Sequence, residues 1–141
     1  MADITVTAAN VVSVSGAQNT GNLASTTITA GKIVYLNASN QWALAAANST
    51  ALIAGGGTTW GIALHAALAS QPLAVQVGGV CGFGVVFTVG VIYVISATAG
   101  GIAPITDLVS TNYISILGIA TTTSNLDMST LPKTATGVVK P

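Results

Sequence analysis

Short runs of apolar, mostly β-branched residues alternate with turn-forming clusters along this chain. The longest apolar run, Val77 to Ile95, is divided by five glycines into pieces of strand length. Clusters rich in Gly, Asn, Ser and Pro separate the other runs, for example at 37–40, 70–72 and 99–101. Short strands at this spacing are typical of antiparallel sheets. The pattern therefore predicts an all-β fold, an antiparallel β-sandwich or β-barrel.

Two segments are open to a helical interpretation. Val77 to Ile95 is long enough to span a membrane as a helix. Its glycines, its β-branched residues and the absence of Lys or Arg close to either end argue against a spanning helix, so we expect strands and no membrane partner. Trp42 to Ala54 contains many alanines but no charged face. It is either a helix or a pair of strands around Asn48–Thr50.

Comparing the chain with itself reveals an internal duplication. The matched segments are Thr27–Leu36 with Val86–Ile95, Gly61–Leu64 with Gly118–Thr121, and Gly79–Val80 with Gly137–Val138. They occur in the same order at nearly equal separations, with one residue of slippage before the tyrosine of the first pair. We predict two similar strand repeats, about 27–82 and 85–139, that form a single β domain over residues 27–141.

Residues 1–26 precede the first repeat and are rich in Ala, Ser, Thr, Asn and Gly. Around their Val11-Val12-x-Val14 run we predict an extended N-terminal arm that adds a strand to the body or to a neighbouring subunit. A partly ordered terminus is the alternative. No basic segment followed by an apolar block opens the chain, so we expect no secretory signal and synthesis in the cytoplasm.

Charge is nearly absent. Only 4% of the 141 residues are charged, the net charge is zero, and there is no Arg and no Glu. The charged residues are Asp3, Lys32, Asp107, Asp127, Lys133 and Lys140. Nucleic-acid binding draws most of its affinity from Lys and Arg, so DNA and RNA are not expected partners. Because 51% of the residues are apolar, the chain can build a core.

Groups for catalysis are correspondingly few. His65 and Cys81 could form a Cys–His pair, but Cys81 lies among apolar neighbours and is better explained as a small buried residue. His65 is better explained as a strand cap or a loop residue. The two together are too few ligands for zinc. We therefore expect no enzyme activity, no catalytic residues, no metal and no cofactor.

Glycines and aromatic residues offer two further sites to weigh. Gly55–Gly57 and Gly78–Gly79 lack the context of phosphate-binding loops and are expected to be turns. Tyr35 and Tyr93 occupy equivalent repeat positions, which favours packing. Trp42 and Trp60, with the tyrosines and Tyr113, could instead form a platform for a sugar.

The sequence resembles the small capsid decoration, or cement, proteins of tailed bacteriophages. The resemblance covers about Ile28 to Pro141. It is carried by Ala30–Leu36, by Gly61–Leu64 with Ala67–Val77, by Tyr93–Pro104, and by Tyr113–Leu126. Members of this family usually carry more charged residues than this chain.

The resemblance implies a structural role in the virion. It implies a β-barrel-like protein that is made in the host cytoplasm and binds the outer surface of the capsid, with the major capsid protein and further copies of itself, as a homotrimer, as partners. Burying apolar faces against other subunits would also protect an uncharged protein from uncontrolled association. The alternative is a glycan- or receptor-binding β module of a tail fibre or adhesin, acting through Trp42 or Trp60.

Overall fold

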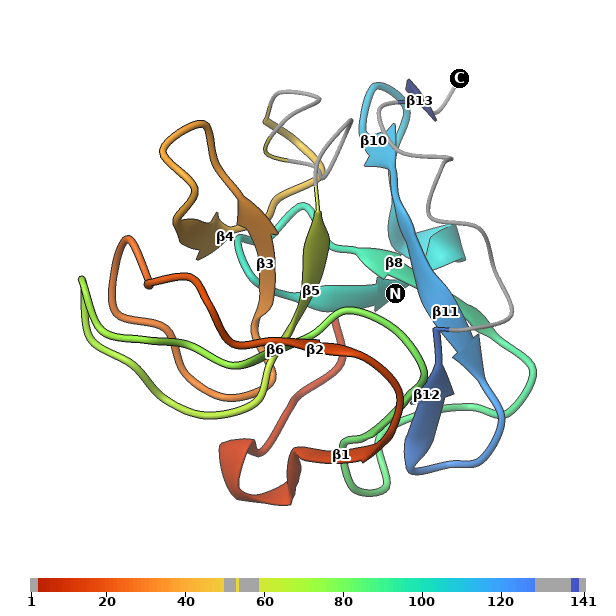
Figure 1. Ribbon diagram of the computed structural model, residues 1–141. Coiled ribbons are helices and arrows are strands. Elements are labelled where there is room, and N and C mark those ends of the chain that lie inside the picture. Colours follow the sequence, from red (N-terminus) through yellow and green to blue (C-terminus); the bar gives the residue numbers. More distant parts are fainter. Residues whose placement is uncertain (1–2, 50–52, 54–58, 129–137, 140–141) are drawn as a thin grey trace.

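The computed structural model describes residues 3–49, 53, 59–128 and 138–139, which form an antiparallel β-sandwich (Figure 1). The strands are β1 (Val12–Ser15), β2 (Gln18–Asn19), β3 (Ile33–Leu36), β4 (Trp42–Leu44), β5 (Trp60–Ala63), β6 (Val75–Gln76), β7 (Val80–Gly82), β8 (Ile92–Ile95), β9 (Ile102–Pro104), β10 (Tyr113–Ile114), β11 (Ile116–Ala120), β12 (Asn125–Asp127) and β13 (Val138–Val139). Two 3-10 helices, η1 (Ala8–Asn10) and η2 (Ile105–Asp107), complete these elements.

Two large sheets make up the body. One has six strands in the order β1-β7-β12-β11-β8-β9, and the other has five in the order β2-β6-β5-β3-β4. A small sheet pairs β10 with β13. Both large sheets end in edge strands, so they are open and do not close into a barrel. The all-β prediction is confirmed, and of its two architectures the sandwich is the one that forms.

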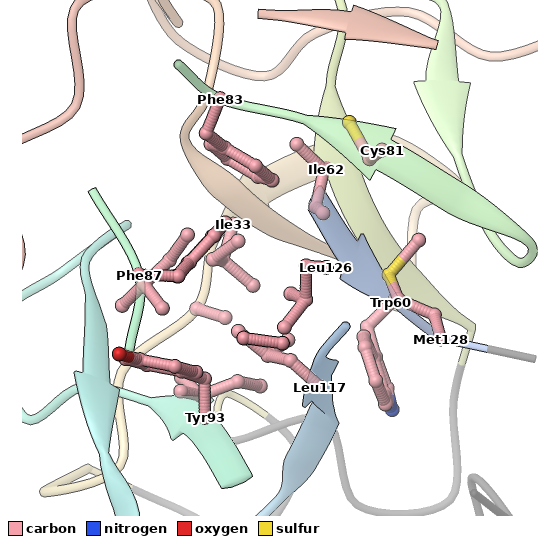
Figure 2. Packing of buried hydrophobic residues seen from close by; sticks show 14 of the residues in the cluster. Ile33, Trp60, Ile62, Cys81, Phe83, Phe87, Tyr93, Leu117, Leu126 and Met128 are labelled. Atoms are coloured by element: carbon pink, nitrogen blue, oxygen red, sulfur yellow. The ribbon is translucent and has the colours of Figure 1, made fainter. Parts of the chain in front are cut away.

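The main core lies between the two large sheets (Figure 2). Trp60 and Ile62 enter it from the five-stranded sheet, and Leu117 and Leu126 enter it from the six-stranded sheet. Three aromatic rings pack beside them: Phe83 and Phe87 meet edge to face with centroids 5.3 Å apart, and Phe87 lies 4.8 Å from Tyr93. Fully burying one such large apolar side chain contributes about 1.5–3 kcal/mol.

Smaller clusters cover the outer faces of the sheets. Trp42, Leu73 and Val75 belong to a cluster on the five-stranded sheet, and Val94 and Leu108 to one on the six-stranded sheet. Strands that are buried on both faces read as continuous apolar runs. That is why Ile92–Ile95 and Ile33–Leu36 show no alternation of polar and apolar residues.

The two repeats have the same topology. In the first, the strands lie in the order β6-β5-β3-β4, and in the second the corresponding order is β12-β11-β8-β9. Gly61 in β5 and Gly118 in β11 also share a close approach to the next strand. A Cβ at Gly61 would overlap the main-chain oxygen of Gln76 in β6, and one at Gly118 would overlap that of Asp127 in β12. The predicted pair of strand repeats is therefore present.

The repeats differ at a β-bulge in β11. Trp60 and Ile62, two residues apart in β5, both enter the main core. In β11 the residues that do so are Leu117 and Ala120, three apart, because the register shifts between Ile116 and Gly118. An extra residue in one strand changes which side chains face inward.

The last sequence landmark is not equivalent in its pairing. Val80 begins β7 and Val138 begins β13, as the repeat alignment suggests. However, β7 pairs with β12, whereas β13 pairs with β10. In the six-stranded sheet, β7 lies beside β12. The equivalent position in the five-stranded sheet, beside β6, is occupied by β2 from the N-terminal segment.

The N-terminal segment adds strands to its own body. β1 forms the edge of the six-stranded sheet by pairing with β7, and β2 forms the edge of the five-stranded sheet by pairing with β6. The buried side chain of Gln76 fastens the junction between them, since its Nε2 lies 2.6 Å from the carbonyl oxygens of both Ser15 and Gly78. Near the start of the segment, Ser96 Oγ donates to Asp3 Oδ1 over 2.6 Å.

The two segments with a possible helical interpretation contain strands. Val77–Ile95 includes β7 and β8, and no helix in the described ranges is long and apolar enough to cross a membrane. Residues 42–44 form β4, residues 45–49 contain no helix, and Ala46 N donates to Ile53 O over 3.2 Å. Residues 50–52 and 54–58, including the turn predicted at 55–57, lie outside the described residues.

We predict that Gly61→Ala and Gly118→Ala each lower the free energy of unfolding by about 1–3 kcal/mol, since each added methyl group would force two paired strands apart. Gly21→Ala is the matched control because a Cβ there meets no atom within 4 Å. Urea unfolding followed by circular dichroism measures all three. Equal stabilities for the three variants would contradict the close strand approach.

Candidate interaction surface

Cys81 is part of the main core and does not reach solvent. It sits in β7, where its residue is fully buried opposite Leu126 of β12. Burial raises the pKa of its thiol from 9.0 to about 12, because the charged thiolate is poorly solvated there. The nucleophilic form of a cysteine is the thiolate. The thiol is therefore protonated at neutral pH and acts as a small apolar group, as the sequence predicts.

His65 is exposed and forms two hydrogen bonds with neighbouring main chain. Ala74 N donates to Nε2 over 3.0 Å, and Nδ1 lies 2.9 Å from Ala66 O. Because Nε2 accepts, the proton of the neutral ring belongs on Nδ1, which then donates to Ala66 O. The imidazole thus joins the loop after β5 to the segment before β6. This is the loop role predicted for it.

Ionisable groups do not gather elsewhere in the described ranges. Within these ranges there is no group of three or more His, Cys, Asp or Glu residues placed to hold a metal ion. Lys32 is exposed, whereas Asp3, Asp107 and Asp127 are half-buried. The surface of the described part is thus built mainly of uncharged side chains.

Four of the five aromatic residues proposed for a sugar platform are inside the protein, and the fifth, Tyr113 in β10, is half-buried. Trp42 has 0% and Trp60 1% of its surface exposed, and they belong to different apolar clusters. Tyr35 and Tyr93 both lie in the main core, in agreement with the packing role predicted from the repeat. The ring faces of these four residues are consequently not available to a ligand.

The Gly78–Gly79 pair forms the turn between β6 and β7. Gly79 has a φ of +75°, a left-handed conformation that glycine adopts at little cost. Its Cα also lies against the main chain of Ser15 and Gly16, where a side chain would not fit. The turn predicted from the sequence is present, and it lies where β1 leads into β2.

Two hollows lined by described residues are small. One of about 130 Å³ is lined by Ile28, Ala67, Leu68 and neighbouring residues, and another of about 110 Å³ lies between residues 4–8, 29–32 and 100–102. Sites for small molecules usually enclose about 300–1,000 Å³. These hollows are below that range.

Exposed valines are the most distinctive surface feature. Val12 and Val14 of β1 are 56% and 54% exposed, and Val85 and Val89 in the loop between β7 and β8 are 80% and 56% exposed. Gly84, next to Val85, lies against Asn10 at the end of η1, two residues before β1 begins. Sequence reasoning marked the Val11–Val14 run as an arm but did not identify the outward-facing valines. The Val-Ser alternation at 12–15 was the available signal.

No protein-family model, curated protein or solved structure matches this chain.

We predict that the Cys81 thiol of the folded protein does not react with an aromatic disulfide reagent at about pH 8, and reacts fully once the protein is unfolded in guanidinium. Folding raises the pKa of the thiol, so ionisation of the thiol at high pH stabilises the unfolded state relative to the folded state. The free energy of unfolding should fall as pH rises from 9.0 towards about 12. Cys81→Ala should lack this component of the pH dependence. Rapid labelling of the native protein would contradict the buried position.

Proposed function

We propose that this chain is a structural protein of a tailed-bacteriophage virion, a head decoration or cement protein that binds the outer surface of the capsid and stabilises it. Its partners in this role are the major capsid protein and other copies of the chain, in a homotrimer. The observation that carries the proposal is the uncharged edge strand β1, where Val12 and Val14 are each more than half exposed. Exposed apolar patches are typical of protein-interaction sites.

The rest of the surface supports binding over catalysis. Cys81 is buried and protonated, and both ring nitrogens of His65 are engaged with main chain. Interfaces between subunits combine apolar contact with about one hydrogen bond per 100–200 Å². Exposed threonines, serines and asparagines beside the valines can supply such bonds. The resemblance to decoration proteins supports the capsid as the partner.

The alternative role, a glycan-binding module of a tail fibre or adhesin, rested on Trp42 and Trp60. Both rings are buried, so no exposed aromatic platform at these residues favours it.

Binding to empty heads tests the proposal. Heads are assembled from the major capsid protein of the same virus, expanded, and mixed with the purified chain. We expect the chain to sediment with the heads at a saturable ratio and to raise the temperature at which the heads break open, because each bound copy stabilises the intact shell by mass action. Unexpanded precursor heads serve as the control surface. A chain that stays in the supernatant and leaves head stability unchanged would rule out the decoration role.

A further inference from the structure

The two large sheets have four edges, and the chain itself covers two of them. Along β4, Trp42 N donates to Leu23 O and Ser25 N donates to Trp42 O, both over 2.8 Å. Beside β9, Ile4 N donates to Ile102 O over 3.0 Å. β2 and β1 form the other two edges, and β1, with four residues, is the longer. No described residue pairs with the outer side of β1, which lies at the lower rim of the molecule in Figure 1.

This edge carries neither the charged side chains nor the proline that commonly protect edge strands against pairing. Natural proteins protect edge strands with charged side chains, especially Lys, with Pro, or with bulges. β1 reads Val-Ser-Val-Ser, and no charged residue occurs from Ile4 to Gly31 or from Ile33 to Thr106. It has one bulge, between Ser13 and Ser15, where the pairing with β7 shifts. Apart from that bulge, β1 is an uncharged strand with two exposed valines, and its outer side is open to a further strand.

The pattern of β1 selects a second copy of the same strand as the occupant. When two β1 strands run antiparallel and are centred on Ser13, Val12 of each lies opposite Val14 of the other, and the two Ser13 residues meet. Pairs of β-branched residues directly opposite each other stabilise antiparallel strands, whereas like charges destabilise them. In this register the Val12–Val14 pairs are apolar with apolar and the Ser13 pair is hydroxyl with hydroxyl. Ser15 lies opposite Val11, and no charge is repeated across the axis. The strand is thus complementary to itself.

We propose that β1 is a self-association edge, through which two copies of this chain pair antiparallel about a two-fold axis and join their six-stranded sheets into one. The inference deepens the proposed function by naming one contact of the assembly. A two-fold contact is closed, so it doubles whatever unit carries it. It yields a dimer from a monomer, or a hexamer from a homotrimer.

The molar mass in solution tests the contact. We expect the wild-type protein to form an even-numbered species in sedimentation velocity and light scattering, and Val14→Lys to halve its mass, because two lysines would then enter each strand pair. Val109→Lys is the matched control, since Val109 is 64% exposed in the loop after η2 and lies outside β1. It should leave the mass unchanged. Circular dichroism establishes that each variant is folded.

Cross-linking tests the register of the two β1 strands, and it does not depend on whether the Val14→Lys variant folds. Ser13→Cys places two thiols opposite each other across the axis, within the range of antiparallel Cβ separations that approach disulfide geometry. Mild oxidation should convert this variant to a covalent dimer much faster than Ser110→Cys, an exposed control position.

A wild-type species that is monomeric, or whose mass Val14→Lys leaves unchanged while Ser13→Cys oxidises no faster than the control, would overturn the proposed contact. The outcome is separable from the decoration role. A Val14→Lys variant that is halved in mass and still binds heads supports both proposals. If the protein never pairs through β1 but binds heads, only the decoration role is supported. If it pairs through β1 but does not bind heads, only the self-association edge is supported.

Discussion

The near absence of charged side chains is the constraint on which the rest of this structure depends. With so few ionisable groups, stability comes from apolar burial and from hydrogen bonds of the main chain and of neutral side chains. Gln76 illustrates this: a buried amide, not an ion pair, holds the junction between β1 and β2 to the turn after β6. The same constraint leaves the surface without the charges that normally keep protein molecules apart.

The duplication explains how one chain builds two stacked sheets. Each repeat supplies four strands in the same order, and in each a glycine permits close approach of the third and fourth strands. The N-terminal segment then completes both sheets at one rim. Its strand β2 lies beside β6, at the position that the repeat alignment assigns to β13. Its strand β1 extends the six-stranded sheet. The resulting asymmetry leaves β1 as an edge whose outer side no described residue pairs with.

Sequence patterns predicted the all-β class, the two repeats, the turn at Gly78–Gly79 and the burial of Cys81, because these depend on local composition and spacing. They did not decide between barrel and sandwich, since closure depends on whether distant edge strands meet. Sequence patterns also did not predict the bulge near Leu117, because a one-residue shift is hard to detect in a chain so rich in Gly, Ala and Val. Burial of Trp42 and Trp60 was missed for a related reason, as these two residues have no counterpart in the second repeat and pack in different clusters.

The central claim is that this protein associates through uncharged surface, and the salt dependence of its association tests that claim most directly. Sedimentation equilibrium at about 50 mM and about 500 mM NaCl spans a large change in the screening of exposed charges. The account predicts association at both concentrations, with dissociation constants that agree within about threefold, a difference below 1 kcal/mol. Association that weakens by more than about tenfold in the higher salt, or a protein that is monomeric in both, would contradict it.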